Sequence, residues 1–183
     1  PALVPLSAPP EWLERFGALA GTSFDAITRC VEVPKGERYP PFRESALITH
    51  RGLSGPAILQ TSSYWQYGGG RGPISIDLMP GVDATAWLME HRGSQQTPAN
   101  LLATVLPRRI AASFAELHGW TKPIVQTSKS VLNDIARTLK DWQIQPSGTL
   151  GYAKAEVTLG GVDTTALSQQ TFEARSVPGL YFI

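Results

Sequence analysis

The sequence predicts an α+β protein in which a β-barrel-like part is interrupted by a small helical bundle. Residues 1–80 combine short runs of alternating apolar and polar residues with many Gly and Pro residues. Residues 81–142 change to apolar residues at helical spacing, and 143–183 return to strand-like runs. We therefore predict a β-rich domain built from 1–80 together with 143–183, and a helical domain over 81–142.

The first zone opens with a short helical pattern over 10–19 that places Trp12 and Phe16 on one side. A strand ending at His50 is expected to run through a Gly-rich turn into a helix that begins near Pro56. The strands predicted in this zone cover 24–33, 44–50 and 73–78.

The second zone contains start signals for four short helices. Asp83, Thr97 and Ser128 are residue types that cap helices, and Pro suits the first helical turn. The four starts are expected at Asp83, Thr97-Pro98, Pro107 and Ser128. The last helix has a continuous apolar face, formed by Val131, Leu132, Ile135, Leu139 and Trp142.

The third zone reads as strands over 143–148 and 151–159, separated by turn residues. The chain begins without Met and ends on Leu-Tyr-Phe-Ile183, side chains that need a neighbouring layer to bury them. We therefore expect the chain to be a piece of a larger protein.

The composition narrows the functional classes. Hydrophobic residues make up 42% and charged residues 17%, which is typical of a folded globular protein. A net charge of +1 argues against a nucleic-acid surface over the whole molecule, although a local patch stays open. No apolar run approaches the roughly 20 residues that span a bilayer. Cys30 is the single cysteine, so no internal disulfide forms and a cytoplasmic setting fits best.

The turn over 52–56 is the first candidate site. A Ser on a tight strand-to-helix turn resembles a nucleophile elbow, with His118 and Asp77 as partners for Ser54, but Pro56 stands where the motif needs Gly. The simpler interpretation is that Ser54 caps the helix. A third is that free N–H groups at this helix start contact an anion or a cofactor.

Other motifs predict no catalytic chemistry. The run Gly68-Gly-Gly-Arg-Gly72 lacks the ending of a phosphate-binding loop and suits a flexible hairpin loop. The three histidines show no metal-ligand spacing, so we predict no metal site and no catalytic residue. The helical zone has seven basic and five acidic residues, a balance usual for a solvated surface.

Several blocks, taken together and in order along the chain, resemble the BaiN/YhiN-like NAD(P)/FAD-dependent oxidoreductases. The blocks are Pro1-Ala-Leu-Val-Pro-Leu6, Thr49-His50-x-Gly52-Leu-Ser-Gly-Pro-Ala-Ile-Leu-Gln60 with Ser63-Tyr-Trp65, Gly148-Thr-Leu-Gly-Tyr-x-Lys-Ala-Glu-Val-Thr-x-Gly-Gly-Val162, and Pro178-Gly-Leu-Tyr-Phe182. The resemblance implies that the chain is the insert domain of a flavoprotein, roofing the flavin site and shaping the pocket of a small-molecule substrate. FAD, with NAD(P)H as a reductant, would belong to the full-length protein, whose FAD-binding domain would be this chain's partner.

The resemblance also implies which residues would approach the flavin. Thr158, Gly160, Gly161 and Val162 would form the segment that nears the ring, because two glycines let a backbone approach a flat ligand. Ser54 and Gly55 would face the same cleft. A plain hairpin turn over 158–162 is an equally good interpretation.

Two alternatives belong to other functional classes. The chain could be a non-catalytic module that binds nucleic acid or protein, although nucleic acid is an unlikely partner on charge alone. The less favoured alternative is a serine hydrolase that uses Ser54. Under the main hypothesis we expect the isolated chain to lack flavin and redox activity.

Overall fold

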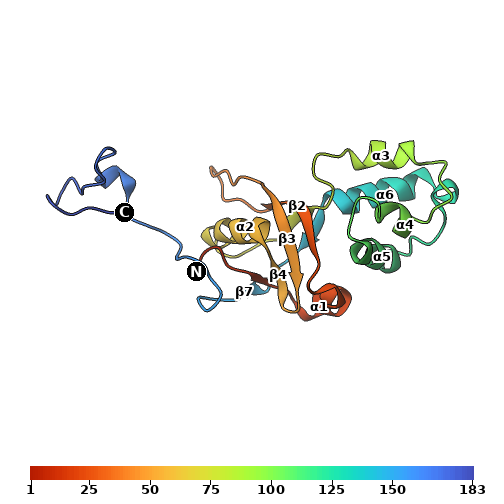
Figure 1. The fold of residues 1–183 in the computed structure, drawn as a ribbon, viewed down its shortest axis with the longest axis horizontal. Coiled ribbons are helices and arrows are strands. Elements are labelled where there is room, and N and C mark those ends of the chain that lie inside the picture. The colour runs from red at the N-terminus through yellow and green to blue at the C-terminus, as the bar shows by residue number, and fades with distance from the viewer.

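The computed structural model describes residues 1–183, and an antiparallel sheet forms its centre (Figure 1). The seven strands run in the order β6-β5-β2-β3-β4-β1-β7. Their bounds are β1 Leu6–Ser7, β2 Ser23–Cys30, β3 Phe42–Thr49, β4 Gly52–Ser54, β5 Ile74–Asp77, β6 Trp142–Ile144 and β7 Gly148–Thr149. The edge strands β6 and β7 do not pair with each other, so the sheet is not closed. The predicted α+β class is confirmed, and the barrel is confirmed only as an open, barrel-like sheet.

Strand β2 shows why the alternating pattern predicted a strand. Every second residue from Phe24 to Cys30 is buried, and the residues between them face outward. Helix α2 (Pro56–Tyr67) covers the buried face. The Thr28 hydroxyl donates a hydrogen bond to the Ala57 carbonyl oxygen at 3.0 Å and lies 2.6 Å from the Thr61 hydroxyl. This buried polar pair fixes the position of α2 on the sheet.

Strand β4 is short and tightly packed between two neighbours. Gly52 has φ +139°, and a Cβ there would overlap the Leu6 carbonyl oxygen of β1. A Cβ on Gly55, where φ is +87°, would lie 2.7 Å from the Ser45 carbonyl oxygen. Gly55 is the N-cap of α2 and no side chain caps this helix, so the prediction that Ser54 caps it is wrong. The two glycines are required by strand packing.

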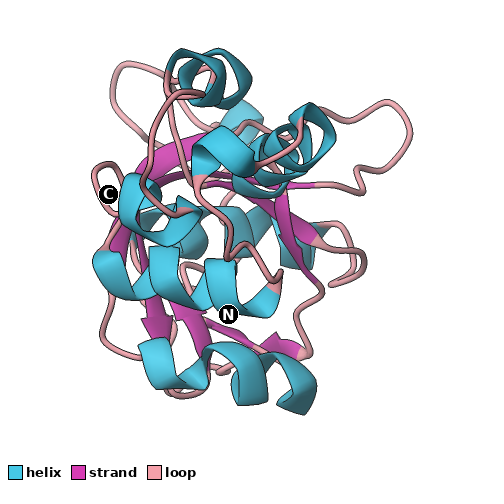
Figure 2. Ribbon diagram, turned by 90° about the vertical axis from the view of Figure 1, so that its right-hand side faces the viewer, coloured by secondary structure: helices cyan, strands magenta, loops and turns pink.

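Four helices lie between β5 and β6 in the chain, and we call them the helical unit. They are α3 Ala84–Glu90, α4 Pro98–Leu102, α5 Arg108–Leu117 and α6 Lys129–Lys140. Helix α3 packs on α6, and α4 packs on α5 (Figures 1 and 2). Asp83 Oδ1 accepts from the Ala86 N–H and Ser128 Oγ accepts from the Val131 N–H, as predicted for caps. The starts predicted at Thr97-Pro98 and Pro107 are also confirmed.

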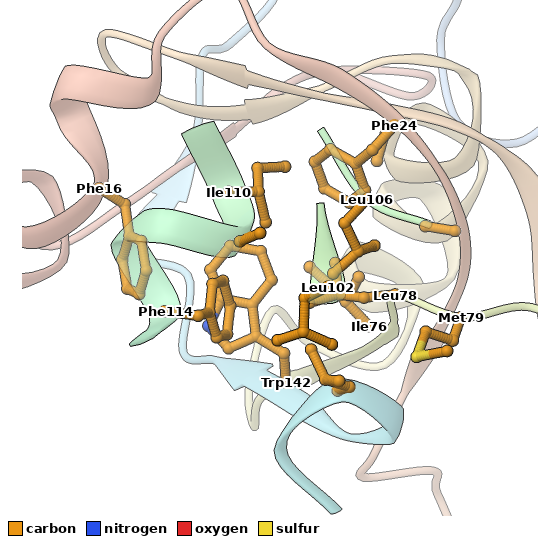
Figure 3. Packing of buried hydrophobic residues seen from close by; sticks show 14 of the residues in the cluster. Phe16, Phe24, Ile76, Leu78, Met79, Leu102, Leu106, Ile110, Phe114 and Trp142 are labelled. Atoms are coloured by element: carbon orange, nitrogen blue, oxygen red, sulfur yellow. The ribbon is translucent and has the colours of Figure 1, made fainter. Parts of the chain in front are cut away.

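A single hydrophobic cluster of 34 buried residues runs through the sheet and the helical unit. Figure 3 shows its aromatic part, where Phe16 of α1 (Pro10–Phe16) and Phe114 of α5 meet Trp142 of β6. The Phe16 ring centre lies 5.6 Å from that of Phe114 and 5.0 Å from that of Trp142. These contacts, favourable for tilted aromatic rings, hold the helical unit against the sheet.

Lys140 ties the end of the helical unit to its beginning. Its Nζ lies 2.6 Å from Asp77 Oδ2 and donates hydrogen bonds to the carbonyl oxygens of Met79 and Val82 at 2.9 and 3.0 Å. The Lys140 ammonium group therefore connects the segment where the chain leaves the sheet, after β5, to the end of α6, directly before the chain returns to the sheet at β6.

The strand predicted over 151–159 is wrong. Gly151 has φ +71°, and its carbonyl oxygen accepts from the N–H groups of Lys154 and Ala155, so the chain turns instead of extending. Only the isolated bridge between Ala2 and Val157 remains. Residues 158–183 extend away from the sheet as an arm with one short 3-10 turn over Thr164–Ala166 (Figure 1). None of the helices combines the length and hydrophobicity needed to cross a bilayer.

Candidate functional site

A groove of about 560 Å³ lies where the helical unit meets the sheet. It is lined by residues of α1, α5, α6 and β6, which come from the N-terminal part of the chain, from the helical unit and from the strand that follows it. Its polar side chains include Arg15, His118, Arg137, Gln143 and Gln145. The groove exists because the aromatic cluster joins these elements.

The floor of the groove is aromatic and rigid. Trp12 stacks on Trp142 with ring centres 5.8 Å apart, and both rings contact Phe16. All three side chains are at least nine-tenths buried, so they support the groove and do not offer free ring faces. The Trp12 Nε1 atom is buried without a hydrogen-bond partner.

The groove lining holds two arginines and two carboxylates, Glu11 and Asp141, so its formal charges balance. Arg15 lies exposed on α1 and forms no salt bridge. Arg137 on α6 pairs only with Asp134, at 2.6 Å on the exposed surface, an interaction that water and salt weaken. The acidic Asp141 accepts hydrogen bonds from Ser75 Oγ and Gln143 Nε2, which partly satisfy its charge. The guanidinium groups thus remain accessible to an anion.

The edge strand β6 supplies amide groups. Trp142 and Ile144 are buried, while Gln143 and Gln145 between and after them are exposed. This alternation follows from the pleat of the strand. Carboxamides both donate and accept hydrogen bonds, so this edge can contact polar groups of either kind.

His118 is the C-cap residue of α5 and stacks on Trp120, with ring centres 4.7 Å apart. Burial lowers the pKa of His118 below its ordinary value. Because the imidazole is then neutral at pH 7, the positive charge of the groove comes from the arginines.

The residues proposed for a serine-hydrolase triad do not meet. Asp77 binds Lys140 Nζ and the Met79 N–H, and His118 stacks on Trp120. Neither forms a hydrogen bond with Ser54. No group of three or more His, Cys, Asp or Glu side chains comes together in the chain. The three residues of the proposed triad are therefore not assembled into one site.

The residues predicted to approach a flavin lie in two separate places. Thr158, Gly160, Gly161 and Val162 are exposed at the start of the arm, and open space surrounds both glycine Cα atoms. Ser54 and Gly55 lie at the junction of β4 and α2, and no hydrogen bond joins them to the arm. Their cofactor role stays a prediction.

The sequence does not mark the two arginines of the groove as site residues. Arg15 and Arg137 are far apart in the chain, and neither belongs to a motif. Arg137 entered only a count of charges in the helical zone. The sequence does carry one signal for the groove. Trp12, Phe16 and Trp142 are large aromatic residues, and the contacts among them bring α1 and β6 together.

Comparison with known proteins places the chain in a family. The family described as HI0933-like protein barrel and H2TH domain matches residues 1–157. The chain belongs to this family. The barrel and H2TH description fits the open antiparallel sheet and the helical unit broadly, and the arm lies outside the matched region.

The chain is also similar to two curated proteins named ribosomal RNA dihydrouridine synthase. The one from Escherichia coli (strain K12) is 45% identical over 186 residues, covering 99% of this chain and 44% of the relative. The one from Haemophilus influenzae (strain ATCC 51907 / DSM 11121 / KW20 / Rd) is 38% identical over 149 residues, covering 78% of this chain and 35% of the relative. The chain thus spans less than half the length of these relatives.

These findings correct four expectations. The chain matches the HI0933-like family along most of its length, so its assignment as an insert of a BaiN/YhiN-like oxidoreductase is wrong. Its description as a flavoprotein insert-domain fragment that roofs a small-molecule redox site is wrong for the same reason. The relatives are named for action on ribosomal RNA. Both the ranking of nucleic acid as an unlikely partner and the choice of a missing FAD-binding domain as the partner are therefore overturned, and the nucleic-acid alternative is closer.

Proposed function

We propose that this chain is the RNA-binding part of a ribosomal RNA dihydrouridine synthase. The observation that carries the proposal is the 45% identity to the Escherichia coli enzyme of that name across 99% of the chain. An enzyme that modifies ribosomal RNA must hold a long polyanion beside its reaction site, and phosphate contacts dominate such binding.

The groove between the sheet and the helical unit suits the RNA backbone. Arginine presents a planar fork that binds phosphate oxygens through two hydrogen bonds, and Arg15 forms no salt bridge, although Glu11 and Asp141 line the same groove. Gln143 of β6 and Gln145, directly after the strand, line the same groove, where they can contact ribose hydroxyls or base edges. The buried Trp12 and Trp142 keep this surface in one conformation.

We assign binding and positioning to this chain, not the redox step. Dihydrouridine differs from uridine by two hydrogen atoms on the base, and their transfer needs a redox partner such as a flavin. The FAD and NAD(P)H predicted from the sequence remain proposals for the longer protein, because 158–162 and the turn at Ser54 do not form one cofactor site here. A cytoplasmic location is part of the same proposal.

The test is equilibrium binding of the chain to ribosomal RNA fragments at several salt concentrations. We expect affinity to fall as salt rises, and Arg15→Gln and Arg137→Gln each to lower the slope of log affinity against log salt by about 0.7, the value for one lost phosphate contact on a single strand.

Arg92→Gln is the matched control, because Arg92 is exposed on the helical unit but does not line the groove. Its affinity should equal that of the wild type. An absence of RNA binding at low salt, or equal losses in all three variants, would contradict the proposal.

A further inference from the structure

A second pocket, of about 350 Å³, lies at the C-terminal end of α2 and uses none of the groove residues. We call it the tyrosine pocket. Its lining is Glu37, Arg38, Tyr39, Ser63, Tyr64, Tyr67 and Leu159. Three of these residues are tyrosines that come from two segments, the loop between β2 and β3 and helix α2.

The tyrosine rings are arranged around Tyr39. Its ring centre lies 5.2 Å from that of Tyr64 and 6.4 Å from that of Tyr67, with interplanar angles of 54° and 69°. Tyr64 and Tyr67 are three residues apart on α2 and so share one side of the helix. Tyr67 is 64% exposed, which leaves its ring face open to a ligand.

Phe42 of β3 packs against Tyr64 of the pocket. Its ring centre lies 5.5 Å from that of Tyr64, so Tyr64 is held between Phe42 and Tyr39. The pocket is therefore a built aromatic surface and not a chance group of mobile side chains.

Among the polar groups of the pocket, the Ser63 hydroxyl accepts a hydrogen bond from the Leu3 N–H at 3.0 Å. The Tyr39 hydroxyl is buried without a hydrogen-bond partner at normal geometry. Burial, followed by the nearby charge of Glu37, raises the pKa of this phenol, so it stays protonated and able to donate. Arg38 is exposed and forms no salt bridge. A ligand with a negative charge would pair with Arg38.

The glycine loop after α2 borders the pocket. The Trp65 indole Nε1 donates to the Gly72 carbonyl oxygen at 2.9 Å and so anchors the loop over 68–72. A Cβ on Gly68 would lie 3.3 Å from the Tyr39 hydroxyl oxygen. The glycine therefore leaves room beside the Tyr39 hydroxyl.

We propose that the tyrosine pocket takes one unpaired base of the RNA, stacked on Tyr67 and Tyr64, while Arg38 binds the adjacent phosphate. The inference rests on the proposed function, because that function supplies RNA as the ligand. Proteins read unpaired RNA by stacking splayed bases on aromatic side chains and bonding their edges. An enzyme that acts on a base inside folded RNA must take that base out of its stack.

The occupant is a single-stranded nucleotide and not a duplex. In a duplex both faces of each base are covered by its neighbours, so the open Tyr67 ring has nothing to stack on. The pocket also falls in the range of about 300–1,000 Å³ typical of small-ligand sites, which suits one nucleotide.

The experiment compares the binding of a single-stranded oligouridine and of an RNA duplex, each of about 12 nucleotides, within the site sizes of single-strand binders. Tyr67→Leu should weaken binding of the single strand roughly 5- to 100-fold, as expected when one stacking contact is lost. It should change duplex affinity less than twofold, because duplex RNA would bind through the groove. Tyr67→Phe should retain the wild-type affinity, since it keeps the ring.

Tyr152→Leu is the control, because Tyr152 is 69% exposed and does not line the pocket. A 5-iodouridine placed in the oligouridine should crosslink to Tyr64 or Tyr67. If RNA binds with salt dependence but Tyr67→Leu and Tyr152→Leu behave alike, the base-pocket inference is overturned while the proposed function stands. If neither RNA binds, the proposed function itself fails.

Discussion

Cys30 lies at the end of β2 on the face that α2 covers, and its thiol points toward the Thr61 carbonyl oxygen. Burial raises the pKa of Cys30 to about 11, against an ordinary value of 9.0. Cys30 is buried and belongs to the hydrophobic cluster. The same burial makes the thiol a poor nucleophile at neutral pH, since the thiolate is the reactive form.

The raised pKa of Cys30 predicts a stability change with pH. The unfolded thiol ionises near pH 9 while the folded thiol keeps its proton to about pH 11, so this contribution is complete below pH 9 and is lost as pH rises toward 11. Urea unfolding of the wild type and Cys30→Ala at pH 8 and pH 10 tests this. The wild type should lose more free energy of unfolding than the variant, and equal losses would disprove the assignment.

The buried hydroxyls of Thr28 and Thr61 form a coupled pair between β2 and α2. Thr28→Val should lower the free energy of unfolding by about 1–3 kcal/mol, because it removes the hydroxyl that donates to Ala57 O and contacts Thr61. Thr28→Val with Thr61→Val should recover part of that loss, since no buried hydroxyl then lacks its partner. Additive losses in the double variant, measured by urea unfolding, would show that the pair is not coupled.

Among the elements, those with local signals could be predicted from the sequence. The caps at Asp83 and Ser128 and the alternation in β2 depend on residues close in the chain, and all three are confirmed. Strand β4 could not be predicted, because it has three residues and is held by β1 and β3. Gly52 and Gly55 looked like a ligand-binding turn, whereas tertiary packing explains both.

Lys140, at the end of α6, contacts the end of β5 and the segment that follows it. Lys140→Met keeps the aliphatic stem but removes the donor to the Met79 and Val82 carbonyl oxygens, leaving Asp77 without its cation. We expect a loss of about 1–3 kcal/mol in the free energy of unfolding. Amide exchange should become faster in α6 and β5. Lys129→Met, at the exposed start of the same helix, is the control. Equal losses of stability in the two variants would show that the Lys140 contacts do not stabilise the fold.

At the scale of the whole molecule, the one continuous core explains why the candidate site escaped sequence reasoning. The groove needs α1, α6 and β6 side by side, and the aromatic contacts that join them are all long-range. The tyrosine pocket likewise needs the loop before β3 to meet the end of α2. Neither arrangement follows from a motif or a spacing.

The groove and the tyrosine pocket share no lining residue, and this predicts independent contributions to RNA binding. The losses in binding free energy from Arg15→Gln and Tyr67→Leu should add within about 0.5 kcal/mol in the double variant, as for separated sites. Fluorescence anisotropy with one single-stranded RNA measures all three variants. A double variant no weaker than either single one would place both residues in one shared contact.

Ultraviolet crosslinking of the chain to ribosomal RNA, followed by identification of the crosslinked peptides, tests directly whether the groove and the tyrosine pocket bind RNA. We expect crosslinks within α1, β6 and the C-terminal half of α2, the segments that line the groove and the tyrosine pocket. These crosslinks should weaken at high salt, because phosphate contacts hold the complex. Crosslinks confined to the arm over 158–183, or none at low salt, would contradict this expectation.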